Sequence, residues 1–334
     1  NKEYKATHTT PDSLTINYYL AEMSEMGVEY CFMEVSSHGI HQKRTEALHF
    51  EGGVFTNLSH DHLDYHPTLA DYRDVKKSFF DYLPKSAFAL TNADDKNGKI
   101  MLQNTKAKTY TYALKSYADY RTQILENHFK GLLLKINDSD IWVKLIGHFN
   151  AYNLTAVFAC ADILGLEKDE LLRFMSTLDN VSGRFDYFVT PSNITVIVDY
   201  AHTPDALTRL LAALRPHVAG QLHVLFGAGG DRDPGKRPLM GRAAAEAADR
   251  VWITDDNPRS EDPAMIRAAV LQGCPEAVDA GAREDAIAKA MGALGPGDVL
   301  AVAGKGHESG QEIAGIVHAF DDVAMVRKLV GALP

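Results

Sequence analysis

The sequence lacks any apolar stretch that approaches about 18 residues, the length expected of a helix that spans a membrane. Cysteine is scarce: Cys31, Cys160 and Cys274 are far apart and odd in number, and their spacing fits no metal site. Positive charge is in deficit, because 44 acidic residues exceed 34 lysines and arginines and leave a net charge of −10. That balance argues against a nucleic-acid-binding protein that relies on phosphate contacts. We therefore expect a cytoplasmic protein with reduced thiols, no membrane span and no nucleic-acid partner.

A true phosphate-binding loop of the G-x-x-x-x-G-K-[ST] type is also missing. Residues 230–236 give G-x-x-x-x-G-K, but Arg237 stands where a serine or threonine would bind Mg²⁺. The glycine-rich segment 227–238 still follows a predicted strand and precedes a predicted helix. It therefore remains a candidate anion-binding loop, although it fails as a Walker A motif.

What the sequence does contain is an alternation of short apolar runs with longer amphipathic stretches. The runs are rich in valine and isoleucine without polar alternation, which is typical of strands buried on both faces of a parallel sheet. Strands are predicted over 30–35, 52–58, 86–92, 194–200, 221–229, 250–256 and 298–304. Helices are predicted over 10–27, 71–83, 146–165, 204–218 and 235–249. The alternation predicts an α/β fold with mostly parallel sheets.

The middle of the chain follows a different pattern. Segments 105–114 and 131–147 partly alternate between polar and apolar residues, and the second contains the turn-forming sequence NDSD. We expect a small antiparallel section here, within the first of two domains, since 334 residues suffice for two cores. The pattern changes near residue 190, which predicts domains at 1–190 and 191–334.

Polar side chains follow the predicted strands of the first domain, at the carboxyl ends where α/β sheets bind ligands. Glu34 ends one strand and is either a Mg²⁺ ligand or a solvated loop acid. Segment 57–66 holds three histidines, including His62, and two aspartates, which suits either a metal site or a polar loop. Lys76 lies near these loops on the helix predicted over 71–83, and by itself has the character of a solvated lysine.

Three further positions carry polar groups suited to a nucleotide. Asn150 and Asn153 lie three positions apart and share one face of a predicted helix, where they either bind a purine or phosphate or cap the helix. Asp199 ends a strand, a place from which a carboxylate often contacts a ribose.

Residues 251–263, VWITDDNPRSEDP, leave two interpretations open. Asn-Pro is a common turn dipeptide and Pro263 could open a helix, so the segment can be only a turn after a strand. Alternatively, the turn directs Arg259 into a crevice. Arg232 and the loop 303–311, with Lys305, His307 and Glu308, would share that crevice.

Taken in order, eleven short motifs resemble those of the Mur ligase family over essentially the whole chain. They are THTTPDS, MEVSSHGIHQKR, NLSHDHLDYH, YRDVKKSFF, NADD, GHFNAYN, SGRFD, VDYAHTPDAL, GDRDPGKRP, DDNPRSEDP and GKGHE. The resemblance implies a central ATPase-type domain of mostly parallel sheet with a small antiparallel section. A Rossmann-like α/β C-terminal domain would follow it.

The resemblance also implies the activity of the diaminopimelate-adding members of the family. These ligases use ATP to join UDP-N-acetylmuramoyl-L-alanyl-D-glutamate and meso-2,6-diaminopimelate, through an acyl phosphate, in peptidoglycan synthesis. Glu34, His62 and Lys76 then correspond to the Mg²⁺-binding and catalytic residues, with Lys76 carried as a carbamate. We expect ATP as a substrate, Mg²⁺ as the cofactor and a monomeric protein.

The same match implies three groups of binding residues. The UDP-muramoyl-peptide site would contain Thr9, Thr10, Ser36, Gln42 and Arg44. The ATP site would contain Asn150, Asn153, Arg184 and Asp199. The diaminopimelate pocket would contain Arg232, Asp256, Asn257, Arg259, Gly304 and Glu308.

The sequence departs from the family pattern at its start. Neither the family's phosphate-binding loop nor its uridine-binding domain precedes the TTP motif, and the chain opens at Asn1. We expect the chain to begin inside a longer protein and, by itself, to show no measurable ligase activity. One alternative is therefore a non-catalytic fragment that binds a nucleotide or a muropeptide.

The other alternative is a lysine-adding or folylpolyglutamate-synthase-like relative. Arg259 favours diaminopimelate, because an arginine fork can pair with the distal carboxylate that lysine lacks. Facing lysine, the same arginine would meet a second ammonium and repel it.

Overall fold

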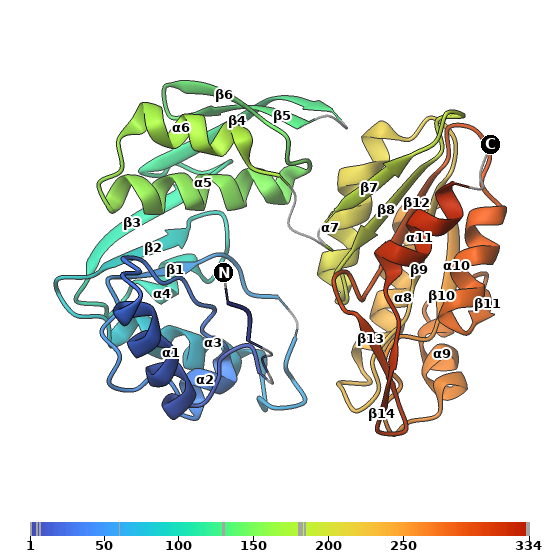
Figure 1. Ribbon diagram of the computed structural model, residues 1–334, viewed down its shortest axis with the longest axis horizontal. Coiled ribbons are helices and arrows are strands. Elements are labelled where there is room, and N and C mark those ends of the chain that lie inside the picture. The colour runs from blue at the N-terminus through green and yellow to red at the C-terminus, as the bar shows by residue number, and fades with distance from the viewer. Residues whose placement is uncertain are drawn as a thin grey trace. The chain divides into compact units, whose positions relative to one another are not determined.

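A computed structural model describes residues 2–4, 6, 8–59, 61–128, 131–179, 183 and 185–331 (Figure 1). Backbone packing divides the chain into two compact units. Unit 1 comprises Asn1–Leu58, Tyr65–Thr122 and Tyr152–Leu171, and unit 2 comprises Ser59–Asp64, Gln123–Ala151 and Leu172–Pro334. Each unit is built from pieces that are discontinuous in the chain, and the domain boundary near residue 190 stays a prediction.

The first half of the chain forms a six-stranded sheet in the order β1-β2-β3-β4-β5-β6. The strands are β1 (Gly52–Phe55), β2 (Phe88–Asn92), β3 (Lys108–Ala113), β4 (Tyr120–His128), β5 (Gly131–Ile136) and β6 (Ser139–Val143). β1 to β4 pair in parallel, whereas β5 and β6 form an antiparallel hairpin. The predicted antiparallel section is thus confirmed for 131–147 and wrong for 105–114. Residues 108–113 pair with β2 in parallel and so extend the parallel part of the sheet.

Six helices accompany these strands. They are α1 (Ser13–Glu25), α2 (Ser37–His41), α3 (Leu69–Asp81), α4 (Gly98–Met101), α5 (His148–Ile163) and α6 (Lys168–Thr177). Phe80 of α3 and Leu83 just after it are buried with Phe55 of β1 and Ala89 of β2 in one apolar cluster. This packing fixes the side of the helix on which Lys76 lies.

The strand predicted over 30–35 is wrong. Residues 28–36 belong to no helix or strand of the described chain, and Tyr30 and Phe32 are 53% and 76% exposed. Both side chains line a cavity of about 470 Å³ whose wall also includes Val54 of β1. The segment thus borders a cavity and pairs with no neighbouring strand in the described chain. Strand residues are stabilised by pairing with a neighbouring strand, and apolar side chains alone cannot replace that pairing.

The second sheet has the order β11-β10-β9-β12-β8-β7. Its strands are β7 (Asp186–Val189), β8 (Thr195–Asp199), β9 (Leu222–Phe226), β10 (Arg250–Thr254), β11 (Val278–Gly281) and β12 (Val299–Ala303). All pair in parallel except β7, which is antiparallel to β8 at the edge. The strands predicted over 194–200, 221–229, 250–256 and 298–304 are confirmed.

Helices cover both faces of this sheet, as expected of a doubly wound α/β fold (Figure 1). One face packs against α7 (Pro204–Leu214), α8 (Lys236–Ala247) and α9 (Pro263–Leu271). The other packs against α10 (Arg283–Gly292) and α11 (Asp322–Val330). A 3₁₀ turn at Arg215–His217 extends α7, and β13 (Gly310–Ile313) and β14 (Ile316–Ala319) form a separate hairpin.

Local sequence signals account for several helix starts. The Asp12 carboxylate accepts hydrogen bonds from the backbone N–H groups of Leu14 and Thr15 at the start of α1. Asp262 caps α9 in the same way, and Pro263 occupies its first turn, so the helix start predicted there is confirmed. These caps fix where the loops before the helices end.

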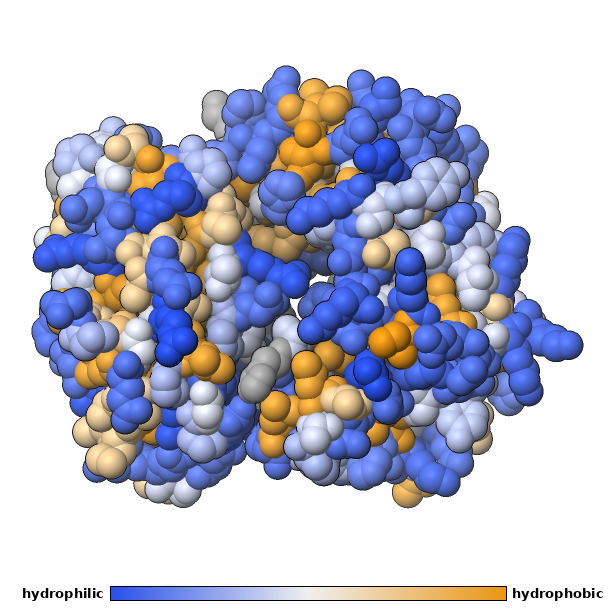
Figure 2. Space-filling view, turned by 180° about the vertical axis from the view of Figure 1, so that it is seen from behind, coloured by the Kyte–Doolittle hydropathy of each residue, from blue (hydrophilic) through white to orange (hydrophobic). Residues whose placement is uncertain are grey.

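Hydrophilic side chains dominate the face of the molecule shown in Figure 2, and apolar side chains appear there in separate patches. Within the ranges that the structure describes, no helix has both the length and the apolar character needed to cross a bilayer.

Candidate functional site

A hydrogen-bond network in unit 1 joins the residues expected to bind the UDP-muramoyl peptide. The Oγ1 of Thr10 donates to the carbonyl oxygen of Glu34 at 2.9 Å and accepts from the N–H of Ser36 at 2.9 Å. Arg44 donates from Nη1 to the carbonyl oxygen of Thr10 at 2.7 Å and from Nη2 to Oε1 of Gln42 at 2.6 Å. Ser36 is also the N-cap of α2. The network holds three separate segments of the chain in one arrangement.

Gln42 and Arg44 also face an open space. A cavity of about 410 Å³ is lined by His8, Asp12, Ser13, Gln42 and Arg44. Thr9 is exposed, whereas Thr10 is fully buried. The structure therefore brings Gln42 and Arg44 together at a cavity and places Thr10 behind them as support.

Lys76 is not an ordinary solvated lysine. Its Nζ lies 3.3 Å from the carbonyl oxygen of Val35 and 6.0 Å from the centre of the Tyr72 ring. Burial lowers the pKa of the Lys76 ammonium below its usual range, and the neighbouring Glu34 carboxylate only partly opposes this shift. A lowered pKa leaves more of the lysine as a neutral amine, which is the form that acts as a nucleophile.

The polar segment 57–66 is divided between the two units. His62 belongs to unit 2, has a φ of 58°, and donates its N–H to Oδ1 of Asp61 at 2.9 Å. His66 belongs to unit 1, is buried, and contacts Oγ of Ser37 at 2.9 Å. His60 lies outside the described residues. Among the residues that are described, no group of three or more His, Cys, Asp or Glu side chains could hold a metal ion.

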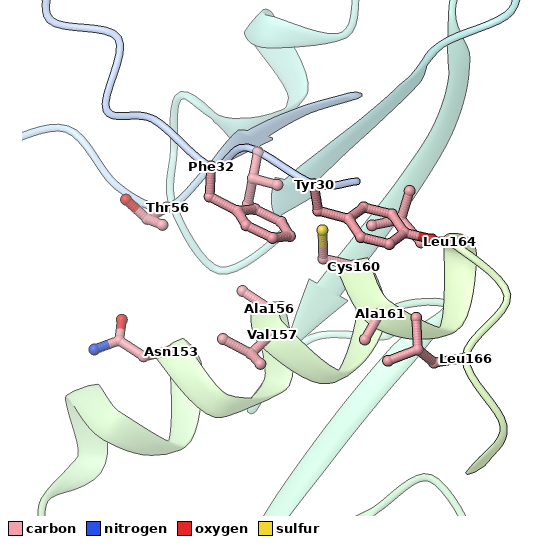
Figure 3. A pocket seen from close by; sticks show the side chains of 11 residues that line it. Tyr30, Phe32, Thr56, Asn153, Ala156, Val157, Cys160, Ala161, Leu164 and Leu166 are labelled. Atoms are coloured by element: carbon pink, nitrogen blue, oxygen red, sulfur yellow. The ribbon is translucent and has the colours of Figure 1, made fainter. Parts of the chain in front are cut away.

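Asn150 and Asn153 lie on α5 but differ in exposure. Asn150 is 9% exposed, and its Nδ2 donates to the carbonyl oxygen of Ile146 at 2.8 Å. This bond ties the Asn150 side chain to the backbone just before α5, and both the binding and the capping alternatives stay predictions. Asn153 is exposed and lines the apolar cavity described above, near Thr56 and at the end opposite Leu166 (Figure 3).

The remaining expected residues of unit 2 lie after the carboxyl ends of its parallel strands. Asp199 ends β8, Arg232 follows β9, Asp256, Asn257 and Arg259 follow β10, and Gly304 and Glu308 follow β12. Asp199 is 9% exposed, and its oxygens accept the N–H groups of Phe185 at 3.0 Å and Ala201 at 2.9 Å. The sheet topology thus gathers these loops at one edge, the usual ligand edge of such sheets.

Two glycines allow the loops to approach one another. A Cβ on Gly230 would lie 1.9 Å from the carbonyl oxygen of Pro258, and the N–H of Gly230 donates to Asn257 at 2.9 Å. Gly304 has a φ of 114°, and a Cβ there would lie 2.8 Å from Oδ2 of Asp256. The Asp256 carboxylate therefore occupies space that only glycine leaves open.

Asn257 and Glu308 are held together by Lys305. The Nδ2 of Asn257 donates to Oε2 of Glu308 at 2.9 Å. The Nζ of Lys305, a fully buried side chain, donates to the same Oε2 at 2.9 Å and to Oδ1 of Asn257 at 3.1 Å. Two of the expected pocket residues thus form one hydrogen-bonded cluster.

Arg259 is fixed through both its backbone and its side chain. Its φ of 51° is uncommon for a residue other than glycine. Its N–H donates to the carbonyl oxygen of Glu312 at 3.0 Å, and its own carbonyl accepts from Ala314 at 2.7 Å. Its Nη1 donates to the carbonyl oxygen of Gly230 at 2.7 Å, and its Nε lies 3.3 Å from Oε2 of Glu312. The chain leaves the sheet at Thr254, two residues earlier than the predicted end at 256, and the following turn holds the guanidinium in place.

The other arginines of this region differ in whether their side chains are exposed to a ligand or already paired. The Arg232 side chain is 54% exposed, and Arg184 lies outside the described residues. Arg237, the residue that excluded a Walker A motif, is buried and pairs through both Nη atoms with Glu261 at 2.9 and 2.7 Å. Hydrogen bonds from Arg237 lower the pKa of Glu261. Arg237 is thus buried next to the glycine-rich loop, and its guanidinium is already paired with Glu261.

Two residues that no sequence motif predicted complete this group. The Nε2 of Gln311 donates to the carbonyl oxygen of Asp256 at 2.6 Å, and the N–H of Glu312 donates to Oδ1 of Asn257 at 2.9 Å. Both lie on β13, directly after the GKGHE motif. That adjacency was the only available signal, because a short exposed hairpin has no periodicity that marks an inward face.

A buried ion pair lies beside the cluster and was also missed. Arg283 on α10 and Asp322 on α11 are 1% and 0% exposed, and they pair at 2.8 Å (Nε to Oδ1) and 2.6 Å (Nη2 to Oδ2). Nη2 of Arg283 also donates to the carbonyl oxygen of Ala303, next to Gly304, at 2.9 Å. Although burial acts against the charge, Asp322, Asp256 and Glu308 together raise the pKa of Arg283.

Two family models match this chain. Residues 1–161 match the model described as the Mur ligase middle domain, and residues 183–306 match the model described as the Mur ligase glutamate ligase domain.

Curated relatives share extensive sequence identity with this chain. The UDP-N-acetylmuramoyl-L-alanyl-D-glutamate–2,6-diaminopimelate ligase of Bacteroides thetaiotaomicron is 50% identical over 329 residues, which cover 96% of this chain and 68% of the relative. The enzyme of the same name from Cytophaga hutchinsonii is 44% identical over 339 residues, covering 100% of this chain and 70% of the relative.

Solved structures have the same fold. A UDP-N-acetylmuramoyl-L-alanyl-D-glutamate–2,6-diaminopimelate ligase aligns with a TM-score of 0.63 and 38% identity, over 97% of this chain and 69% of that structure. The MurF ligase of Thermotoga maritima in complex with ADP aligns with a TM-score of 0.63 and 17% identity, over 78% and 59% of the two chains.

Proposed function

This chain belongs to the Mur ligase family, and on that premise we propose that it joins meso-2,6-diaminopimelate to UDP-N-acetylmuramoyl-L-alanyl-D-glutamate with ATP. The names of relatives that are 44–50% identical support this assignment over the folylpolyglutamate-synthase-like and non-catalytic alternatives. The geometry that carries it is the group of loops after β10 and β12, in which Arg259 and the Glu308 carboxylate are each held by hydrogen bonds.

The charges of this cluster complement those of diaminopimelate, which has two carboxylates and two ammonium groups. Arg259 keeps N–H donors beyond those used by Gly230 and Glu312, and a guanidinium fork is suited to a carboxylate. Glu308 and Asp256 supply negative charge for an ammonium group. Lysine lacks the second carboxylate, so it would leave the remaining N–H donors of Arg259 without an acceptor from the amino acid.

The reaction we propose has two steps. The D-glutamyl carboxylate attacks the γ-phosphorus of ATP, the bond from that phosphorus to the β–γ bridging oxygen breaks, and ADP leaves. The neutral amine of diaminopimelate then attacks the acyl carbon, phosphate leaves with the electrons of its C–O bond, and the amine loses a proton. Positioning and charge stabilisation supply most of the catalysis in such transfers.

Lys76 and Glu34 would serve the phosphoryl-transfer step. Carbon dioxide and the neutral Lys76 amine would form a carbamate with loss of one proton, which converts a cation into an anion with two oxygen donors. The Glu34 carboxylate and such a carbamate are the oxygen ligands that Mg²⁺ prefers, and His62 is the nitrogen donor assigned by the resemblance. When bound, Mg²⁺ supplies positive charge that offsets the charge of the phosphates.

The remaining residues would bind and orient the two larger substrates. We assign Gln42, Arg44 and Thr9 to the UDP-muramoyl peptide, with Thr10 and Ser36 as their support. Asn150, Asn153, Arg184 and Asp199 are assigned to ATP; the ADP in the complex of Thermotoga maritima MurF supports a nucleotide site in this fold. We further propose that the protein acts in the cytoplasm as a monomer, which light scattering during gel filtration would test.

The test of this function is the choice of amino acid. In an active ligase that contains this chain, ATP and UDP-N-acetylmuramoyl-L-alanyl-D-glutamate are supplied with either meso-diaminopimelate or lysine, and the product mass is measured. We expect the diaminopimelate product to form at least about 100-fold faster, because a buried or fixed charge without its partner costs a few kcal/mol. Equal use of lysine would contradict the proposal.

Arg259→Ala tests the residue that we hold responsible. We expect the KM for diaminopimelate to rise by at least about tenfold, with a much smaller change in the KM for ATP. Equal changes in both constants would remove Arg259 from the amino-acid pocket.

A further inference from the structure

Lys305 is a fully buried cation for which the proposed reaction assigns no contact with substrate. Its side chain is 0% exposed, and its Nζ lies 2.9 Å from Oε2 of Glu308 and 3.1 Å from Oδ1 of Asn257. A buried ammonium is costly unless it is paired and hydrogen-bonded. Both partners of Lys305 belong to the expected amino-acid pocket, so the charge is placed where it acts on that pocket.

The hydrogen bond from Lys305 makes the two oxygens of the Glu308 carboxylate differ in how many hydrogen bonds they accept. Oε2 accepts from Lys305 and from Nδ2 of Asn257, each at 2.9 Å. Within the described part of the chain, Oε1 accepts no hydrogen bond, and the Glu308 side chain is 33% exposed. One oxygen is therefore fully engaged by the protein, while the other remains available to a ligand.

Lys305 also settles the orientation of the Asn257 amide. Oδ1 of Asn257 accepts from Lys305 at 3.1 Å and from the N–H of Glu312 at 2.9 Å, while Nδ2 donates to Glu308. An ammonium and a backbone N–H can only donate, so they require an acceptor at that position. The amide cannot exchange its oxygen and nitrogen without losing all three bonds.

We propose that Lys305 is a positioning residue of the amino-acid pocket, which directs Oε1 of Glu308 toward an ammonium group of the incoming diamino acid. This inference rests on the proposed function. Lys305 acts through Glu308 and Asn257 and does not touch the amino acid. It also offsets the negative charge that Asp256, Glu308 and Glu312 would otherwise concentrate in one small region.

The test is Lys305→Met in an active ligase that contains this chain. We expect the KM for diaminopimelate to rise about tenfold or more, while the KM for ATP and kcat change by less than about threefold. Lys289→Met is the matched control, because it removes an equal charge from an exposed site on α10 and should change neither constant. A KM for diaminopimelate that stays at the wild-type value in Lys305→Met would overturn the proposal.

A double-mutant cycle separates positioning from a general loss of structure. If Lys305 acts through Glu308, adding Lys305→Met to Glu308→Gln should raise the KM for diaminopimelate by less than about twofold. Effects that multiply would overturn the proposal. If Lys305→Met does not fold, Lys305→Gln keeps a donor without the charge, and its KM should lie between those of wild type and Glu308→Gln.

Failure of this inference is distinguishable from failure of the proposed function. A wild-type enzyme that does not use diaminopimelate refutes the function. An active wild-type enzyme whose Lys305 variants keep the same KM refutes only the role of Lys305.

Discussion

Lys76 combines partial burial with a neighbouring carboxylate, and the lowered pKa of its ammonium makes the amine available for carbamate formation. We predict that ¹³C-bicarbonate produces a carbamate resonance in the NMR spectrum of the wild-type protein. Lys76→Ala should lose that resonance, and an active ligase with this change should lose activity by about 100-fold or more, which bicarbonate cannot restore.

Lys99→Ala, a change at an exposed lysine after β2, should keep both the resonance and the activity. A Lys76→Ala enzyme with full activity would contradict the carbamate.

Individual site residues were predictable where a motif or a strand end marked them. Gln42 and Arg44, which share one assignment, lie together at a cavity, and Asn257 and Glu308, which share another, are hydrogen-bonded; their roles in binding stay predictions. The burial of Thr10 and Asn150 was not predictable, because it depends on contacts with residues that no local pattern identifies. Gln311 and Glu312 were missed for the same reason: they reach the site through a hairpin.

At the scale of elements, Arg283 and Asp322 tie α10 to α11 through a fully buried ion pair. Asp322→Ala would leave the Arg283 guanidinium buried without its partner. We predict a loss of about 3–5 kcal/mol in the free energy of unfolding, measured by urea denaturation.

The double variant Arg283→Met/Asp322→Leu should recover most of that loss, because it removes both charges and keeps apolar volume. Glu284→Ala, at an exposed position beside Arg283, should change stability by no more than about 0.5 kcal/mol. A loss of free energy of unfolding in Asp322→Ala far below about 3 kcal/mol would show that the pair does not hold the helices together.

The loops after β9 and β10 meet at Gly230, where a methyl group would lie 1.9 Å from the carbonyl oxygen of Pro258. We predict that Gly230→Ala displaces the loop that carries Asn257 and Arg259 and raises the KM for diaminopimelate about tenfold or more. Gly292→Ala is the matched control. Beyond the backbone of its own helix, no described atom lies within 4 Å of the place that a Cβ would take there, so the KM should not change.

The control variant Gly292→Ala should also stabilise the protein slightly, by up to about 1 kcal/mol, since alanine favours a helix more than glycine does. Wild-type binding of diaminopimelate by Gly230→Ala would show that the loop contact is dispensable.

Most elements followed from the sequence because their causes are local. Asp12, Asp262 and Pro263 begin helices wherever the fold places them, and the apolar runs of the second sheet can hardly be anything but buried strands. Residues 30–35 have the same composition but pair with no neighbour among the described residues, and residues 108–113 pair in parallel despite their alternation. Pairing partners are distant in the chain, so composition alone cannot predict them.

At the scale of the whole molecule, stability should depend on pH through buried His223. Burial lowers the pKa of its imidazole from the usual 6.5, and Asp298 only partly opposes this. The unfolded chain therefore binds a proton more readily than the folded one between the two pKa values, so stability is full above about pH 6.5 and falls below it.

We predict that the stability difference between wild type and His223→Leu changes by up to about 1.4 kcal/mol per pH unit below pH 6.5 in urea unfolding. His318→Leu, at an exposed histidine on β14, is the matched control. A pH-independent difference for His223→Leu would mean that His223 is not kept neutral by burial.

The segment 29–35 should also differ from the neighbouring sheet in the rate at which its backbone amides exchange hydrogen. Within the described chain its N–H groups donate no hydrogen bond, whereas β2 is buried throughout and paired on both sides. In heavy water, the amides of 29–35 should exchange at the rate of an unfolded peptide. The amides of β2 should exchange only when a large part of the structure opens. Hydrogen exchange would therefore distinguish this segment, whose N–H groups are unprotected in the described chain, from the paired strand β2.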